Sequence, residues 1–431
     1  MECLAVSRGS ADSLCDSPLY RRNLEPRLLE ALTDSPVVLI HGPRQSGKTT
    51  LARIVGEPRG YAYRSFDDDV HREAAENDPA GFVDELPEKV TLDEVQRVPS
   101  LFTALKASID RRRVPGRFIL TGSANVLLVP KLADSLAGRM AILRLHPLSQ
   151  AELEGTASRF LDTLFSGSFK TRRMDRLREE LVTRVVSGGY PAALARSPKK
   201  RRATWYRDYL EAIVQRDVKE LSRIHSLQAI PRLLALTAAH TAQLLNVSDL
   251  SGSFQLSRPT IAAYVTLLER VFLLDTLPPW HSNRVSRLIK SPKLHLGDTG
   301  LACALLGVNA DDLVQDRPLL GHLLETFVFQ ELKREASGHQ DPHAFFHFRD
   351  RDGAEVDIVV ERGTRAVAGL EIKAGATVRG GDFRGMRKLK EAAGKRFVAG
   401  VVLYDGETPA RFGEGMYAVP LRRLWSPGLS N

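Results

Sequence analysis

One stretch constrains the fold of this chain more than any other. A short apolar run, residues 37–40, leads into Gly-x-x-x-x-Gly-Lys-Thr at 42–49, and an apolar helical pattern follows. Strand, glycine-rich loop and helix in this order are the context of a phosphate-binding loop. The glycines permit a tight turn whose N–H groups point into one concavity, and the helix N-terminus behind it favours an anion. The predicted nucleotide-binding residues are Gly42, Pro43, Arg44, Gln45, Ser46, Gly47, Lys48, Thr49 and Thr50.

Two side chains of the loop and two acids further along the chain have predicted roles. Lys48 is expected to reach the terminal phosphates of ATP, and Thr49 to offer its hydroxyl to Mg²⁺. Residues 89–96 read as an apolar-leaning strand that contains Asp93 and Glu94 near its end. Asp93 can hold Mg²⁺ directly or through water, and Glu94 can orient or deprotonate the attacking water. The alternative, two surface acids ending a strand, is less favoured about 45 residues after a phosphate-binding loop.

Two later stretches could complete the catalytic set. The buried-type strand at 116–120 runs into small polar residues, which would place Ser123 or Asn125 beside the γ-phosphate, or else form a plain strand-to-loop turn. Arg139, just before a strand at 140–145, could be an arginine finger that stabilises charge at a neighbouring copy's γ-phosphate. A finger of this kind implies a homo-oligomer whose assembly ATP promotes. The alternative is an ordinary surface arginine.

Strands alternating with helices predict a parallel α/β sheet with its ligand at the carboxyl ends of the strands. The motifs resemble those of the AAA-type P-loop ATPases. Gly42 to Thr49 matches Walker A, Leu92-Asp93-Glu94 matches Walker B, Thr121 to Asn125 matches sensor 1, and Leu136 to Arg139 resembles the arginine-finger region. The resemblance implies ATP and Mg²⁺ as ligands.

Composition sets the broad class. A chain of 431 residues with 43% hydrophobic and 26% charged residues predicts a globular protein of two to four domains. No apolar run approaches the roughly 18 residues needed to cross a bilayer, so no membrane partner is expected. The opening stretch lacks the apolar core of a secretory signal and reads as a loose tail. Three cysteines show no metal or redox spacing, and a cytoplasmic location is expected.

The net charge of +9 is concentrated in one region. Residues 170–223 hold 15 Lys and Arg against 7 Asp and Glu, with the densest block at 199–202. Such a block can be an electrostatic footprint for DNA or RNA, or a solvated helical face.

The region that follows suggests a second recognition element. Residues 244–250 and 258–268 read as two helices joined by a turn, and 271–275 as a strand. Helix, turn, helix and strand predict a winged-helix element, with Arg258 and Tyr264 among the residues that would face DNA. The alternative is a protein-interaction module.

The last third carries a second catalytic-looking set. Glu325 lies on a predicted helix and Asp357 on a predicted strand, and period-2 alternation puts Glu371 and Lys373 on one face of the next strand. The three acids could bind a divalent metal, and Lys373 could orient water or stabilise developing charge. The set resembles the PD-(D/E)xK nuclease core. Idle surface carboxylates are the alternative.

As a whole, the chain resembles prokaryotic AAA-type ATPases joined to a C-terminal nuclease-like domain of poorly defined function, over roughly residues 20–410. The expected division is a loose tail (1–20), an AAA-type ATPase domain (21–150), a helical basic region (151–235), a winged-helix-like element (236–290) and an α/β nuclease-like domain (291–420).

Two functions remain open for such a chain. The first is a Mg²⁺-dependent ATPase whose nucleotide state controls a C-terminal effector domain that acts on nucleic acid. The second is a nucleotide-switched regulatory module that binds a protein partner and uses an inactive nuclease-like domain as a scaffold.

Overall fold

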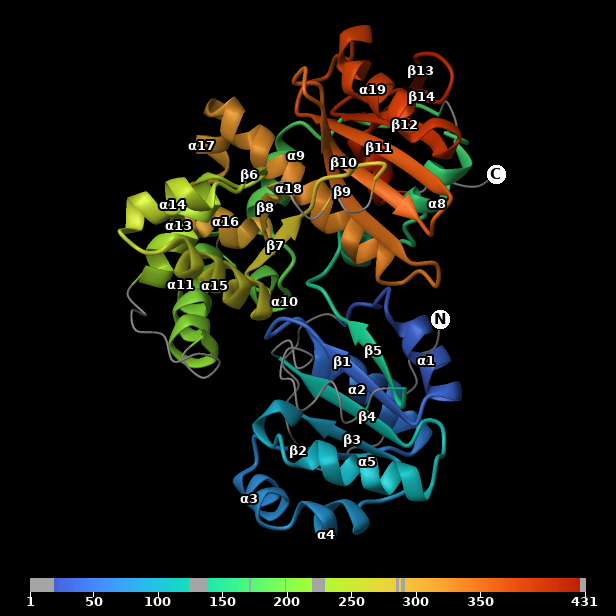
Figure 1. The fold of residues 1–431 in the computed structure, drawn as a ribbon, viewed down its shortest axis with the longest axis vertical. Coiled ribbons are helices and arrows are strands. Elements are labelled where there is room, and N and C mark those ends of the chain that lie inside the picture. The colour runs from blue at the N-terminus through green and yellow to red at the C-terminus, as the bar shows by residue number, and fades with distance from the viewer. Residues whose placement is uncertain are drawn as a thin grey trace.

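The computed structural model describes residues 19–123, 136, 138–169, 172–197, 199–218, 229–283, 287 and 291–426. Most of the predicted loose tail and the candidate Asn125 lie outside these residues. Figure 1 shows the first sheet, in blue and cyan, at one end of the molecule and the last sheet, in orange and red, at the other. Helices and a small sheet from the middle of the chain lie beside them.

The first sheet confirms the predicted parallel α/β arrangement. Its five strands follow the order β2-β3-β4-β1-β5, and every neighbouring pair is parallel. Four strands overlap runs predicted from the sequence: β1 (Val37–His41), β3 (Val90–Asp93), β4 (Phe118–Gly122) and β5 (Met140–Arg144). The edge strand β2 (Ala62–Ser65) completes the sheet. Every residue of β1, β3 and β4 is buried, as expected for a parallel sheet covered on both faces.

Alternate residues of β1 pack into two separate cores on the two faces of this sheet. Val38 and Ile40 pack with helices α1 and α2, whereas Val37 and Leu39 pack with side chains of α3, α4 and α5. These helices are α1 (Glu25–Asp34), α2 (Lys48–Gly56), α3 (Asp69–Asn77), α4 (Pro79–Asp84) and α5 (Leu101–Arg111). The parallel strands and α2 together place the phosphate-binding loop at the carboxyl edge of the sheet.

The middle of the chain is helical, as predicted, with one small sheet. Its first helices are α7 (Gln150–Glu154), α8 (Phe160–Ser166), α9 (Glu179–Ser187), α10 (Pro191–Leu194) and α11 (Lys199–Ile213), which continues as a π-helical turn, Val214–Val218. The next elements are α13 (Ala229–Ala239), β6 (Gln243–Leu244), α14 (Val247–Phe254), α15 (Arg258–Arg270), β7 (Leu274–Leu277), β8 (Lys293–Leu296), α16 (Thr299–Leu306) and α17 (Ala310–Gln315).

The predicted helix-turn-helix-strand order is present in α14, α15 and β7, but two details differ. The first helix begins at Val247 rather than at 244, because Leu244 pairs with Lys293 in a three-stranded antiparallel sheet, β6-β8-β7. This sheet spans the expected boundary at 290/291. Tyr264, expected to face DNA, is only 6% exposed and packs in the core. The winged-helix assignment stays a prediction.

The last third is α/β with a mixed six-stranded sheet of order β13-β14-β12-β11-β10-β9. Inward-facing residues of β10 and β11 pack on one face with helix α18, and residues of the same strands pack on the other face with α19. The elements are α18 (Arg317–Ala336), β9 (His343–Arg349), β10 (Glu355–Arg362), β11 (Ala366–Lys373), α19 (Arg384–Ala393), β12 (Phe397–Tyr404), β13 (Ala410–Arg411) and β14 (Met416–Pro420). The nuclease-like identity of this sheet stays a prediction.

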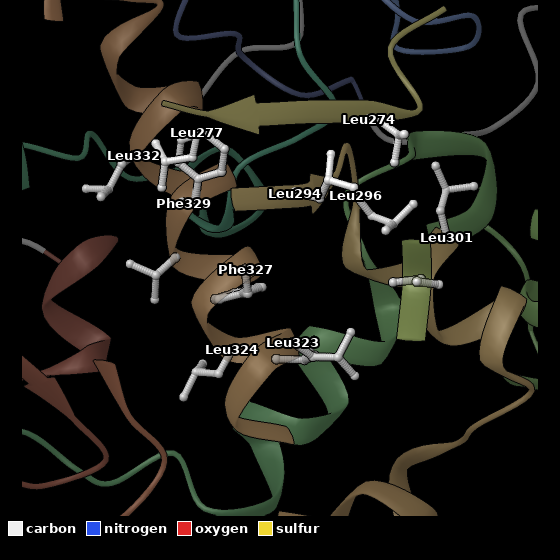
Figure 2. Close-up of a cluster of buried hydrophobic side chains, with 14 of the residues drawn as sticks. Leu274, Leu277, Leu294, Leu296, Leu301, Leu323, Leu324, Phe327, Phe329 and Leu332 are labelled. Atoms are coloured by element: carbon white, nitrogen blue, oxygen red, sulfur yellow. The ribbon is translucent and has the colours of Figure 1, made fainter. Parts of the chain in front are cut away.

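Helix α18 joins the middle and last regions into one body. Figure 2 shows Leu323, Leu324, Phe327 and other α18 side chains beside leucines of β7, β8 and α16. They belong to a single apolar core that runs from Ala151 to Trp425. The two cores of the first sheet contain residues 24–145 only. The first sheet with its helices is therefore one packing unit, and the remainder of the chain is a second. Because the two units share no apolar core, the contacts described below between them are hydrogen bonds and ion pairs.

No helix in the described part of the chain is long and apolar enough to cross a membrane.

Candidate functional site

The phosphate-binding loop has the backbone that the glycines were expected to provide. Gly47 adopts φ +94° as the residue that caps α2, and Gly42 adopts φ +154°. A Cβ on Gly42 would lie 2.1 Å from the carbonyl oxygen of Leu145, so any side chain there would push β1 away from the chain that follows β5. The Ser46 hydroxyl donates to the Pro43 carbonyl (2.9 Å) and closes the turn.

Lys48 lies across this loop. Its ammonium donates to the carbonyl oxygens of Gly42 (3.1 Å) and Pro43 (2.9 Å), and the side chain is almost fully buried. Burial lowers the pKa of Lys48 to about 8, although the charges of Glu94 and Asp93 act in the opposite direction. A buried ammonium that donates to neutral carbonyls is well suited to pair with phosphate oxygens instead.

Asp93 collects three hydroxyl groups at the carboxyl end of β3. Thr49 Oγ1 lies 3.0 and 3.1 Å from its two carboxylate oxygens, Tyr63 donates to Oδ2 (2.7 Å), and the Thr121 hydroxyl also bonds to it. Burial and the Asp93 charge raise the pKa of Tyr63, so the phenol stays protonated as a donor. A threonine hydroxyl touching a carboxylate is the hard-oxygen donor set that suits Mg²⁺. Thr49 and Asp93, each expected to hold Mg²⁺, lie within hydrogen-bond distance of each other, and their role as metal ligands stays a prediction. Tyr63 was not predicted as part of the site.

Glu94 is held in an unusual backbone conformation. Its φ is +56°, a left-handed value that is uncommon for a residue other than glycine and that often marks functional sites. The Ser123 hydroxyl donates to its carboxylate (3.2 Å), and Gln96 donates both to the same carboxylate and to Ser123 (3.0 Å). Ser123 thus lies beside Glu94, while its predicted place beside a γ-phosphate stays a prediction. Gln96 was not predicted.

Arg139 lies away from the loop of its own chain. Met140, the next residue, pairs with Val37 at the start of β1, whereas the loop follows the other end of that strand. The Arg139 guanidinium donates to Asp110 of α5 (2.6 Å). Arg139 can therefore meet a γ-phosphate only on a neighbouring copy, and its role as a finger stays a prediction that light scattering with and without ATP would test.

The loop also contacts the helical middle of the chain directly. Arg44 forms a bidentate ion pair with Asp217 in the π-helical turn, with N–O distances of 2.7 to 2.9 Å. The hydroxyl of Tyr209, on α11, lies 3.3 Å from the Arg44 carbonyl. These partners are far from Arg44 in the sequence, and no sequence motif connects them.

A second contact reaches the loop from the start of the described chain. Arg22 donates to the carbonyl oxygens of Ser46 (2.7 Å) and His146 (2.6 Å), and it pairs with Glu152 of α7 (3.1 Å). All of these groups are buried. Arg22 thus ties the phosphate-binding loop to the beginning of the second packing unit.

Asp275 on β7 is a third junction between the two packing units. It pairs with Arg144 at the end of β5 (3.3 Å) and with Lys333 of α18 (2.5 Å), and it accepts a hydrogen bond from Gln330 (3.0 Å). Burial alone would raise the pKa of Asp275, but Lys333 and Arg144 lower it well below its usual range. One buried carboxylate therefore links the first sheet, the small sheet and α18.

The predicted C-terminal metal ligands Glu325 and Asp357 lie on either side of a lysine ammonium, that of Lys293. Lys293 of β8 donates to Glu325 (2.8 Å) and lies 3.6 Å from Asp357, while Lys373 donates to Glu371 (2.9 Å). Burial alone would lower the pKa of Lys293, but Glu325 and Asp357 raise it, so the lysine is charged. Burial and the Asp357 charge raise the pKa of Glu371 to about 7. Lys293 was not predicted, because a single lysine in a strand carries no motif.

Much of the basic surplus at 170–223 is engaged in contacts within the chain. Arg176 bonds to the Asp405 carbonyl and carboxylate, and Arg184 pairs with Glu180 and Glu154. Further arginines of the region with intrachain partners are Arg173, Arg196, Arg202 and Arg207. Pairing with acids therefore offsets the charge of Arg173, Arg176 and Arg184, whereas Arg196, Arg202 and Arg207 bond to neutral groups and keep their charge.

Comparison with known proteins agrees with this geometry. Residues 34–154 match an AAA domain, and residues 178–312 and 320–424 match two domains of unknown function, DUF8612 and DUF4143. The uncharacterized proteins Mb2031c of Mycobacterium bovis and Rv2008c of Mycobacterium tuberculosis are 30% identical over 411 residues, covering 95% of this chain and 86% of theirs.

Two solved structures show loose likenesses. The Walker-type ATPase PABY2304 of Pyrococcus abyssi is 16% identical with a TM-score of 0.38, covering 67% of this chain and 96% of that one. The RuvB Holliday junction branch migration motor of Thermotoga maritima is 19% identical with a TM-score of 0.29, covering 59% and 89%. The AAA match and the phosphate-binding loop together mark a nucleotide-binding protein of the P-loop ATPase type.

Proposed function

Because this chain belongs to the same family as the mycobacterial proteins Mb2031c and Rv2008c and contains an AAA domain, we propose that it is a Mg²⁺-dependent ATPase whose nucleotide state acts on the rest of the chain. One observation carries the proposal. Thr49 bonds to Asp93, and Thr121 bonds to both Asp93 and the Glu94 N–H at the carboxyl edge of the sheet. Lys48 lies across the adjoining loop, close enough for the charges of Asp93 and Glu94 to act on its ammonium.

Each residue then has a chemical task. The loop N–H groups and Lys48 bind the phosphates, and Lys48 exchanges its two carbonyl partners for phosphate oxygens. Thr49 and Asp93 would hold Mg²⁺, which neutralises charge on the phosphates when it is bound. Glu94 accepts the proton of the attacking water, and Ser123 and Gln96 keep its carboxylate in place.

Replacing Lys48 with Ala tests the binding part of this proposal. We expect the affinity for ATP to fall by about 10- to 100-fold, because charge-assisted hydrogen bonds to the phosphates are lost. Titration with a fluorescent ATP analogue and an assay of phosphate release measure binding and turnover. Lys388→Ala is the matched control, since Lys388 lies on α19 with a partly exposed side chain that pairs with Glu391. Equal affinities in the Lys48 variant and the control would refute the assigned role.

We propose that the Arg44–Asp217 ion pair carries the nucleotide state out of the first sheet. Arg44 is part of the phosphate-binding loop, and its partner lies at the end of α11 in the other packing unit. An anion in the loop would compete with Asp217 for the guanidinium. Because the two units have separate apolar cores, polar contacts of this kind can rearrange without disrupting either core.

Trp205 offers an internal reporter of this coupling. Its ring stacks on Tyr209 at 5.0 Å, and the Tyr209 hydroxyl lies 3.3 Å from the Arg44 carbonyl. We expect ATP to change the emission of Trp205, and Asp217→Asn to reduce that change by about half or more, because a neutral amide holds Arg44 less strongly. Asp208→Asn, at an exposed site on the same helix, is the control, and Trp205→Phe assigns the signal. An unchanged response in Asp217→Asn would show that the ion pair carries no signal.

Between the two open functions, we favour the regulatory module that binds a protein partner. Of the two residues expected to face DNA, Arg258 is exposed in the first turn of α15 and Tyr264 is buried. Other solvent-facing residues of α15 include Ala262, Ala263 and Thr266, which offer little to a phosphate backbone. An assay of ATP hydrolysis with and without DNA or RNA tests this choice, together with a nucleotide-dependent pull-down. Stimulation by nucleic acid, or its recovery in the pull-down, would favour action on nucleic acid instead.

A further inference from the structure

The carboxylate cluster of the last third takes its central cation from another sheet. Glu325 comes from α18, Asp357 from β10 and Glu371 from β11, whereas Lys293 comes from β8 of the small middle sheet. The Lys293 ammonium donates to Glu325 Oε1 at 2.8 Å and lies 3.6 Å from Asp357 Oδ1. The lysine therefore lies where Glu325 and Asp357 approach each other.

These carboxylates do not fit the divalent metal that the nuclease-like resemblance implies. Each one has a protein partner: Glu325 accepts from Lys293, Asp357 Oδ2 accepts from the Ile372 N–H (2.9 Å), and Glu371 accepts from Lys373. Among the described residues, no three His, Cys, Asp or Glu side chains are grouped to hold a metal ion. A metal ion needs oxygens at roughly 2.0–2.6 Å with no cation between them.

The net charge of the cluster and its burial also disfavour a bound divalent metal. Two lysines neutralise two of the three carboxylates, and a divalent ion beside Glu325 and Asp357 would also be repelled by the Lys293 ammonium. The side chains of Lys293, Glu325 and Asp357 are only 8%, 9% and 16% exposed. A catalytic metal site keeps an open position for water or substrate. Here the Lys293 ammonium from β8 fills the space beside Glu325 and Asp357, while Glu371 and Lys373, with side chains 17% and 37% exposed, lie nearer the surface.

We propose that Lys293 is the built-in counter-cation of Glu325 and Asp357, and that it takes the place a divalent metal would occupy. The ion pairs fasten the small middle sheet to the last α/β region. The carboxylates thus serve as a junction between β8, α18 and β10 and not as a metal-dependent cleavage site. This inference does not depend on ATP hydrolysis.

Mn²⁺ binding to the full-length chain tests the proposal. The Asp93→Asn substitution is made in every protein to weaken the candidate metal site of the first sheet, and free Mn²⁺ is measured by electron paramagnetic resonance without nucleotide. In this background we expect no Mn²⁺ site that depends on Asp357. Adding Lys293→Met should create a site for about one Mn²⁺, with an affinity at least about tenfold above any residual Mn²⁺ binding of the Asp93→Asn protein, because the ammonium has been removed from the carboxylates. Asp357→Asn should abolish the new site, and Lys293→Arg, which keeps the charge, should not create one.

Two results would overturn the proposal. The first is Mn²⁺ bound in the Asp93→Asn background and lost on adding Asp357→Asn, which would mean that the native cluster takes a metal. The second is a folded Lys293→Met protein, shown by circular dichroism, that gains no site. If Lys293→Met does not fold, the comparison of Asp93→Asn with Asp93→Asn/Asp357→Asn still decides between a native metal site and none.

Discussion

Glu94→Gln is expected to bind ATP with nearly unchanged affinity and to hydrolyse it about 10²- to 10⁴-fold more slowly, the usual contribution of a general base. The amide keeps the size of the side chain and can still meet Ser123 and Gln96, but it cannot accept a proton from water. Because glutamine tolerates the left-handed backbone at this position about as well as glutamate, the fold should be unaffected.

Single-turnover hydrolysis, measured after nucleotide binding has been confirmed, separates the chemical step from affinity. Glu88→Gln removes a carboxylate from the surface of the same domain and should retain the parent rate, since Glu88 is exposed and pairs with the exposed Arg112. A Glu94→Gln protein that hydrolyses ATP at the parent rate would show that another group prepares the water.

Asp275→Asn is expected to have the largest effect on stability, a loss of about 3–5 kcal/mol in the free energy of unfolding. The amide fills the same space but leaves Arg144 and Lys333 without their shared buried counter-ion. Urea unfolding measures the loss. Asp84→Asn, which breaks the exposed pair with Arg111, should cost less than about 1 kcal/mol and serves as the matched control.

The loss in Asp275→Asn should also depend on pH. Burial lowers the pKa of Lys333 to about 8 even though Asp275 raises it, so removing that charge lowers the pKa further. Between this value and the unfolded value near 10.4, the unfolded chain binds more protons, and stability rises with pH. The deficit of the variant should thus be smaller at about pH 9 than at about pH 7, because a neutral Lys333 needs no counter-ion. An equal deficit at both values would place the lost stability elsewhere.

The first sheet and most of its site could be predicted because their signals are local. A buried parallel strand needs a continuous apolar run, and the loop needs its glycines and lysine at fixed positions beside that run. Lys48 and Thr49 follow β1 directly, and Asp93 and Glu94 end or follow β3, so the parallel pairing of these strands with β4 was enough to bring the motifs to one edge.

The residues that complete the sites could not be predicted in this way. Tyr63 and Gln96 belong to ordinary strand and turn sequences, and only the folded sheet shows that they touch Asp93 and Glu94. Tyr264 was assigned to a DNA-facing surface from the helical pattern alone, but the pattern did not show which face of α15 packs into the core.

By itself, the sequence determined the parallel sheet and the phosphate-binding loop, since contiguous residues and apolar periodicity specify local structure and burial. Only the tertiary structure decided how the two packing units meet. Arg44 and Asp217 are 173 residues apart, and Arg144 and Asp275 are 131 apart. The tertiary structure also decided that Glu325 and Asp357 are paired with a lysine, because Lys293 reaches them from a different sheet. Charge pairs between distant elements depend on how whole surfaces pack, and no local pattern of residues encodes that packing.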